Sequence, residues 1–268
     1  MSIGQITTEQ RGHLLLIGID RTAKLNAFTV EMYADLSRAL GRLERDDALR
    51  CGVIFAHGNH FTAGIDLPQW APVMANGEMP PLPPDGCDPV GLDASRRTKK
   101  PLVVAVQGYC YTIGLELLLA TDIRVAASNT RFAMLEVKRG IFPTGGGTIR
   151  MPVEMGWGNA MRYLLTGDEF DAAEAYRFGL VQAVTEPGEQ LEKAIELAEQ
   201  VAAQAPLAVQ SVLKSSRMAV AEGVASASAE TTAVSQLGPM QQKLLQTEDV
   251  QEGLQAFLER REAQFKGK

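Results

Sequence analysis

Short hydrophobic runs alternate with amphipathic stretches along the first two thirds of the chain. The runs Leu14–Ile19, Gly52–Ala56 and Leu102–Val106 are continuous, a pattern typical of strands that are buried on both faces. Ile123–Ala126 and Arg131–Ala133 predict two shorter strands. Strands that alternate with helices favour an α/β layer architecture.

The stretches between these strands carry helical patterns and capping residues. Thr29 can cap a helix, and the hydrophobic stripe of that helix is Met32, Leu36, Leu40 and Leu43. The leucine-rich segment Gly114–Ala120 predicts a second helix. Asp171–Glu174 is a capping-box pattern, with Asp in the place of Ser or Thr, and Gly179 can close the short helix that it opens.

The last part of the chain is helical by pattern. A final short strand is predicted at Val181–Val184, and from Glu189 onward nearly every segment has a helical pattern, with Pro206 suited to a first helical turn. We therefore predict an α/β body over residues 1–200 and a helical region over residues 201–268. Such a tail cannot easily bury a core of its own, so it should pack on the body or on a partner subunit.

Eight of the 13 prolines lie between Pro68 and Pro101. A continuous helix is impossible at that density, because each interior proline removes a hydrogen bond and clashes with the preceding turn. We expect a long loop with at most a broken turn or two. Long loops inside compact domains are usually functional, so a lid or a pocket wall is favoured over a solvated linker.

The composition, 46% hydrophobic and 22% charged residues over 268 positions, is that of a folded globular chain. The net charge of −6 argues against nucleic acid as a partner. The N-terminus has no secretory pattern, and Leu102–Ala120 is interrupted by polar residues, so no membrane span is predicted. Cys51, Cys87 and Cys110 fit neither a disulfide framework nor a zinc site, which favours reduced thiols and a cytoplasmic location.

Other kinds of site find little support. His57 and His60 have no carboxylate or cysteine close by in the sequence, so no metal site is predicted. Neither a G-x-S-x-G nor a P-loop pattern occurs. Gly145–Gly147 does not follow a strand, as a dinucleotide fingerprint requires, and a run of glycines more simply allows a close backbone approach. No cofactor is predicted.

Three segments combine a hydrophobic entry with a glycine-containing turn, namely Phe61–Leu67, Gln107–Leu117 and Phe132–Gly147. The second leads into a helix start, whose free N–H groups suit a developing negative oxygen. Glu116 lies in that first turn and Glu136 in the third segment, both flanked by hydrophobic residues, which should raise their pKa. Two such carboxylates could share acid and base work, whereas composition alone leaves open two glutamates that face water.

Ordered motifs extend over nearly the whole chain. They are Asp20–Ala27, Phe61–Asp66, Gln107–Tyr109, Ala120–Asp122, Leu135–Glu136 with Gly140 and Pro143, Leu165–Gly167, Gly179–Val181 and Phe257–Arg261. In this order they resemble the motifs of the crotonase, or enoyl-CoA hydratase/isomerase, superfamily. That resemblance implies a ClpP/crotonase-like fold, which is a spiral of β-β-α repeats with a C-terminal α-helical trimerisation region.

The resemblance also implies an acyl-CoA thioester as substrate, with coenzyme A as part of the substrate and no separate cofactor. By alignment, the backbone N–H groups of Ile65 and Ile113 form an oxyanion hole for the thioester oxygen. Glu116 and Glu136 align with the glutamate pair of the family's hydratases. In that alignment Glu116 acts mainly as the base on the attacking water and Glu136 mainly as the acid toward C2.

Further positions are implied to bind the substrate or its CoA part. They are Arg21, Lys24, Ala27, Ala63, Gly64, Asp66, Leu67, Gly114, Pro143 and Lys266. Two departures from the family pattern matter. Thr112-Ile113-Gly114 replaces three glycines, and β-branched Ile113 should resist a positive φ, so the pocket floor is altered. Pro68 replaces a lysine that often binds CoA, so phosphate contacts are expected from Arg21, Lys24 or Lys266.

The intact glutamate pair favours hydration of a 2-enoyl-CoA to a 3-hydroxyacyl-CoA, as in fatty-acid catabolism, because family isomerases usually keep one glutamate. Double-bond isomerisation and thioester hydrolysis are the alternatives inside the family. An acyl-CoA-binding scaffold with little turnover is the alternative from another class. The expected macromolecular partner is a second copy of the chain, in a homotrimer or a hexamer.

Overall fold

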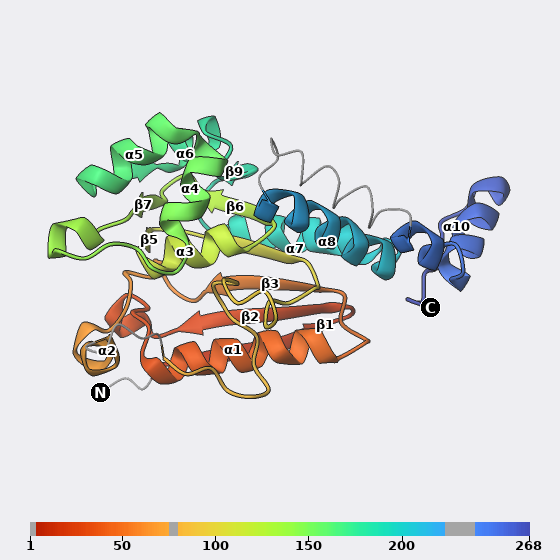
Figure 1. The fold of residues 1–268 in the computed structure, drawn as a ribbon, viewed down its shortest axis with the longest axis horizontal. Helices are drawn as coiled ribbons and strands as arrows, with labels where there is room; N and C mark the ends of the chain where they lie inside the picture. The colour runs from red at the N-terminus through yellow and green to blue at the C-terminus, as the bar shows by residue number, and fades with distance from the viewer. Residues whose placement is uncertain (1–3, 75–79, 223–238) are drawn as a thin grey trace.

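Two sheets form the framework of the protein in a computed structural model that describes residues 4–74, 80–222 and 239–268 (Figure 1). The larger sheet has six strands in the order β1-β2-β3-β4-β6-β9, and the smaller has three in the order β5-β7-β8. β1 runs antiparallel to β2, and the rest of the larger sheet is parallel. The strand bounds are β1 Gln5–Arg11, β2 Leu14–Asp20, β3 Cys51–Ala56, β4 Leu102–Val106, β5 Tyr109–Tyr111, β6 Ile123–Ala127, β7 Arg131–Ala133, β8 Phe170–Asp171 and β9 Ala183–Thr185.

Helices lie on both faces of the larger sheet, and α3, α4, α5 and α6 lie on the same side of the molecule as the smaller sheet (Figure 1). The α-helices are α1 Val30–Arg45, α2 Leu67–Met74, α3 Ile113–Ala120, α4 Gly147–Met155, α5 Trp157–Thr166, α6 Ala172–Arg177, α7 Gln190–Ala202, α8 Pro206–Glu222 and α10 Glu248–Glu259. Two short 3-10 helices are η1 Thr22–Lys24 and η2 Glu136–Arg139. Among the described residues, no helix is long and apolar enough to cross a membrane.

The chain passes from the larger sheet to the smaller sheet and then into a helix, and it does so repeatedly. β4 is followed by β5 and α3, and β6 is followed by β7 and η2. After β3 the same step is made by a single bridge between Thr62 and Cys110, before α2 begins. This repetition is the spiral of β-β-α units that the sequence motifs predict.

Alternate side chains of the parallel strands enter two separate cores. Leu15 and Ile17 of β2 face the core shared with α1 and α3, whereas Leu14 and Leu16 face a second core. The second core is closed by α7, whose small residue Ala198 lies against the sheet. The strands are therefore buried on both faces, as their continuous hydrophobic runs predict.

The predicted elements are confirmed with small shifts at their ends. Thr29 caps α1 by accepting a hydrogen bond from the backbone N–H of Met32 at 3.0 Å. Asp171 caps α6 in the same way through Glu174, and α8 begins at Pro206. The boundary at residue 200 stays a prediction; α7 crosses it, and its last residue, Ala202, belongs to the second core.

The proline-rich segment begins with α2, a helix of about two turns, which fits the expected long loop with a turn or two. α2 holds Pro68 in its first turn, where no intrahelical donor is lost, and Pro72 inside. The Trp70 indole donates to the Phe28 carbonyl oxygen at 2.8 Å and packs edge-on against Tyr33, and these contacts fix α2. Residues 80–101 contain no helix or strand, as predicted.

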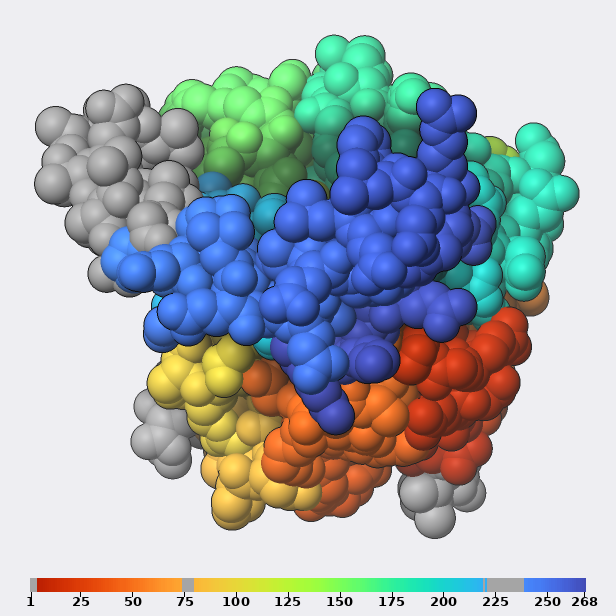
Figure 2. Space-filling model, turned by 90° about the vertical axis from the view of Figure 1, so that its right-hand side faces the viewer, coloured from red at the N-terminus to blue at the C-terminus, as the bar shows by residue number. Residues whose placement is uncertain are grey.

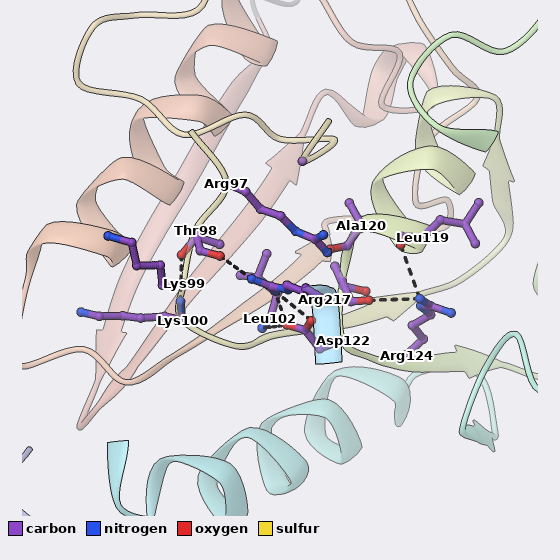
Figure 3. Close-up of polar contacts among 12 residues, drawn as sticks. Arg97, Thr98, Lys99, Lys100, Leu102, Leu119, Ala120, Asp122, Arg124 and Arg217 are labelled. Atoms are coloured by element: carbon purple, nitrogen blue, oxygen red, sulfur yellow. Dashed lines mark hydrogen bonds and ion pairs between the residues drawn. The ribbon is translucent and has the colours of Figure 1, made fainter. Parts of the chain in front are cut away.

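Arginine side chains hold the C-terminal end of α3 (Figure 3). Arg124 is 5% exposed and donates to the carbonyl oxygens of Leu118 and Thr121, and it forms a 3.0 Å ion pair with Glu154. These bonds satisfy carbonyl groups that a helix leaves unpaired at its end. Because α3 is entirely buried, this cap fixes the position of the whole helix.

The side chain of Arg217 attaches α8 to the body at the neighbouring turn (Figure 3). It donates to the Thr98 carbonyl oxygen at 2.7 Å and pairs with Asp122 at 2.9 Å. Farther along, the Arg50 guanidinium donates to the Phe265 carbonyl oxygen at 2.6 Å. Part of the C-terminal region thus packs on the body of its own chain.

Replacement of the arginine that caps α3 should destabilise the fold. The substitution Arg124→Gln removes the described donors of the buried Thr121 and Leu180 carbonyl oxygens and the ion pair with Glu154, so we expect the free energy of unfolding to fall by about 3 kcal/mol. Arg38→Gln is the matched control, because Arg38 is exposed on α1, where water weakens its ion pairs, and its loss should change the free energy of unfolding far less. Chemical denaturation measures both, and equal losses would contradict the role given to Arg124.

Candidate active site

A pocket opens where the carboxyl ends of the strands meet α2, the start of α3 and the segment that follows η2. It brings together seven of the residues predicted from the sequence: Ala63, Ile65, Leu67, Ile113, Glu116, Glu136 and Pro143. Most of its lining is hydrophobic, and its charged lining residues are Glu116, Glu136 and Arg139. The proline-rich segment contributes Trp70 near its start, so it forms a pocket wall there, as expected.

Glu116 is held by two backbone amides. Its side-chain Oε1 accepts hydrogen bonds from the N–H groups of Gly145 and Gly147 at 2.7 Å and 3.1 Å. A Cβ at Gly145 would collide with the carboxylate, so the glycine run permits the close backbone approach that the sequence indicates. Glu116 is 6% exposed, and burial raises its pKa to about 7, with the nearby charge of Glu136 acting in the same direction.

Glu136 faces the same pocket from the start of η2. Burial raises its pKa, and the charge of Arg139 acts in the opposite direction. One of its oxygens, Oε2, is buried and has no hydrogen-bond partner among the described residues. A buried carboxyl oxygen that lines a pocket without a protein partner is suited to accept a hydrogen bond from a bound molecule.

The two amides of the predicted oxyanion hole lie in the pocket wall. The N–H of Phe28 donates to the Gly64 carbonyl oxygen, and the Asp66 N–H donates to the Phe28 carbonyl oxygen. Because these two bonds flank Ile65, the N–H of Ile65 points away from Phe28. Ile113 is the first residue of α3, where helical amides have no partner within the helix. Neither amide donates to another described group.

The positive φ near the hole falls on a different residue from the one that the sequence analysis considered. Ile113 begins the helix, and the residue before it, Thr112, has φ 50° and ψ −116°. Thr112 is one of four described non-glycine residues with positive φ. The departure from a glycine pattern is therefore carried by the threonine, and Ile113 does not need an unusual conformation.

The predicted CoA-binding residues have mixed surroundings. Arg21 is 7% exposed, pairs with Asp66 at 2.7 Å and donates to the Ala27 carbonyl oxygen. All three are predicted residues, and they lie together beside the pocket. Gly64 precedes Ile65 in its loop, and Gly114 follows Ile113 in the first turn of α3. The charge of Arg21 is thus already matched inside the protein, and its contact with phosphate stays a prediction.

Two predicted cations lie at opposite ends of the fold. Lys24 is exposed in η1, which follows the carboxyl end of β2 on the pocket side. Lys266 follows Phe265, which lies with Leu14 and Arg50 at the amino ends of β2 and β3. The structure therefore does not bring Lys266 to the pocket of its own chain, because the length of the strands lies between them.

Sequence reasoning missed several pocket residues. Trp70, Thr112, Arg139, Ile141 and Phe142 line the pocket beside the predicted residues. Arg139 and the two residues after Gly140 could have been suspected from their closeness to Glu136 in the sequence. The hydrogen bonds between Glu116 and the glycine run join residues that are far apart in the chain. No local sequence pattern predicts them.

Comparison with known proteins identifies the class. A family model described as enoyl-CoA hydratase/isomerase matches residues 9–268. An enoyl-CoA hydratase from Mycobacterium tuberculosis, EchA19, is 35% identical over 97% of this chain and 96% of its own length. A carnitinyl-CoA dehydratase from Proteus mirabilis is 32% identical over 96% of this chain and 97% of its own.

Solved structures agree with this class. A probable enoyl-CoA hydratase/isomerase from Mycobacterium abscessus has a TM-score of 0.93 and 44% identity, over 98% of this chain and 99% of its own. The chain belongs to the enoyl-CoA hydratase/isomerase family, and its fold is that of the crotonase superfamily.

The raised pKa of Glu116 predicts an unusual pH dependence of stability. Because its pKa rises from 4.5 to about 7 on folding, the fold favours the neutral acid, and this contribution is lost as the pH rises through about 7. Glu116→Gln keeps an oxygen for the two amides and cannot ionise. As the pH rises from about 5 to about 8, the free energy of unfolding of the variant should therefore rise relative to that of wild type by on the order of 3 kcal/mol.

Denaturation at both pH values measures this gain. Glu192→Gln, at an exposed position on α7, is the control and should show no such trend. A constant difference between Glu116→Gln and wild type would show that the carboxyl group is not neutralised by folding.

Proposed function

We propose that the protein is a 2-enoyl-CoA hydratase, which adds water across the 2,3 double bond and yields a 3-hydroxyacyl-CoA. The observation that carries the proposal is the placement of two glutamates in one pocket, where Glu116 is buried and Glu136 is half-buried. Glu116 is fixed by two amides, and Glu136 offers an oxygen that no described residue bonds. Its relatives include an enoyl-CoA hydratase and a carnitinyl-CoA dehydratase. Both names contain a CoA thioester, which supports an acyl-CoA thioester as the substrate of this protein.

The geometry gives each group a task in that reaction. A water between the two carboxyl groups can donate one hydrogen bond to each, and Glu116 takes a proton as the oxygen attacks C3. The electron pair moves toward the thioester oxygen, where the N–H groups of Ile65 and Ile113 stabilise the charge. Glu136 delivers a proton to C2. A pKa near neutrality allows Glu116 to accept and release a proton at little cost.

The hydrophobic lining supports an acyl chain as the group that fills the pocket. Leu67, Trp70 and Phe142 line the same pocket as the two glutamates. Trp70 is 2% exposed and fixed by its hydrogen bond, whereas Phe142 is 63% exposed. One wall is therefore rigid, and the other leaves the pocket open toward the surface.

Loss of either glutamate should abolish most of the activity. We expect Glu116→Gln and Glu136→Gln each to lower the rate at least about 10²-fold, because each removes a proton transfer. The assay follows the absorbance of the 2-enoyl thioester with crotonyl-CoA and with longer enoyl-CoAs. Glu192→Gln is the control and should retain the wild-type rate.

No loss of absorbance at any chain length with the wild-type protein would contradict the hydratase proposal. Separation of the products by chromatography distinguishes the other reactions of the family, because an isomerase keeps the mass of its substrate and a thioester hydrolase releases free CoA.

Self-association into a trimer or a hexamer is a second part of the proposal. The C-terminal residues form the outermost layer of the face shown in Figure 2. On α10 the side chains of Leu254, Phe257 and Leu258 are 64%, 81% and 79% exposed and lie on one side of the helix. A contiguous exposed hydrophobic stripe is typical of a contact surface.

A charge in this stripe should weaken the assembly. We expect Phe257→Glu to shift the mass in sedimentation toward that of a single chain, because the charge would have to be buried on association. Gln255→Glu adds a charge to the same helix without removing a hydrophobic side chain, so it should leave the mass unchanged. A wild-type mass of one chain would exclude the assembly.

A further inference from the structure

Thr112 occupies a backbone conformation that glycine normally adopts. Its φ of 50° and ψ of −116° are those of the first central residue in a type II′ turn, which is dominated by glycine. It is the one residue between β5 and α3, so the turn from strand to helix has to be made there. A β-branched residue is strained in such a region, and strain of this kind is concentrated at functional sites.

The backbone of Thr112 does not explain why a side chain is present. Its N–H donates to the Ala133 carbonyl oxygen, and its carbonyl oxygen accepts from Leu115 and Glu116. Glycine would make the same three bonds without strain. What threonine adds at this position is its side chain alone.

The side chain of Thr112 lies between the loop that carries Ile65 and the start of α3, which carries Ile113. Thr112 lines the pocket, and its Oγ1 is 2.5 Å from the place that a Cβ on Gly64 would take. It therefore fills the space that the missing side chain of Gly64 leaves. Gly64 precedes Ile65 and Thr112 precedes Ile113, so the hydroxyl lies beside both peptide groups that carry the predicted donors.

The hydroxyl has no task within the described part of the protein, where it forms no hydrogen bond. The contrast with Thr62 is informative, because the Thr62 hydroxyl donates to the Asn26 and Gly64 carbonyl oxygens and accepts from the Gly64 N–H. Thr62 thus fixes the loop, and Thr112 is free to bond a ligand.

We propose that the Thr112 hydroxyl is a third hydrogen-bond donor to the thioester oxygen, beside the N–H groups of Ile65 and Ile113. The inference rests on the proposed acyl-CoA substrate. As the electron pair of the double bond moves onto the thioester oxygen, the Oγ1–H shortens its hydrogen bond to that oxygen and keeps its proton. No bond of the threonine forms or breaks, and no further reactant is needed.

The test compares Thr112→Val with Thr112→Ser. Valine keeps the shape and the β-branch but removes the hydroxyl, whereas serine keeps the hydroxyl. The first readout is the near-ultraviolet band of the enolate of acetoacetyl-CoA, a 3-oxoacyl-CoA whose enolate carries its charge on the oxygens that the hole should bind. We expect valine to lower the enolate-to-ketone ratio of the bound ligand about 10-fold and serine to leave it near the wild-type value.

Rates and stability complete the comparison. The kcat/KM for crotonyl-CoA should fall about 10-fold with valine and much less with serine, while both variants keep a Tm close to that of wild type. Thr112→Gly should lose the enolate band like valine without losing Tm, because it removes the strained side chain. The proposal would be overturned if the valine and serine variants both kept the full enolate band. It would also be overturned if both variants lost the band to the same extent.

The enolate band also separates this inference from the proposed reaction. A wild-type protein that binds acetoacetyl-CoA as enolate but hydrates no enoyl-CoA would contradict the hydratase proposal. The enolate bands of the valine and serine variants would still decide the role of Thr112. A wild-type protein that hydrates crotonyl-CoA while its valine variant keeps the full enolate band would contradict the role of Thr112 alone.

Discussion

The carboxylate of Glu116 and the amides of Gly145 and Gly147 form the interaction on which the site depends. A buried carboxyl group needs donors, since its burial without them would cost several kcal/mol. The pair joins the start of α3 to the start of α4, two helices that follow different turns of the spiral. Glu136 in η2 lies between these two helix starts in the chain and lines the same pocket.

Two opposing effects on Glu116 set its chemistry. Burial favours the neutral acid, and the two amide hydrogen bonds favour the carboxylate, with burial the larger effect. Without the amides the pKa of Glu116 would lie higher still, and in water the carboxylate would be a weaker base. The balance brings its pKa to about 7, where both forms exist and proton transfer in either direction is possible.

Much of this arrangement could be predicted from the sequence, because burial on both faces leaves a continuous hydrophobic run. Leu102–Val106 matches β4 end to end, and Glu116 was singled out by its leucine neighbours. β1 and the short β5 and β8 leave no such run, since β1 is a largely exposed edge strand and the others have only two or three residues. Their pairing depends on partners far away in the chain.

The position of the cations follows from the same topology and sets a condition on CoA binding. Arg21 is neutralised by Asp66, and Lys266 lies at the amino ends of the strands, whereas the pocket lies at their carboxyl ends. In a single chain with a net charge of −6, exposed Lys24 is then the one predicted cation on the pocket side whose charge has no described partner. A second cation for the phosphates of CoA, if it is Lys266, has to come from another subunit. Substrate binding and self-association would then depend on each other.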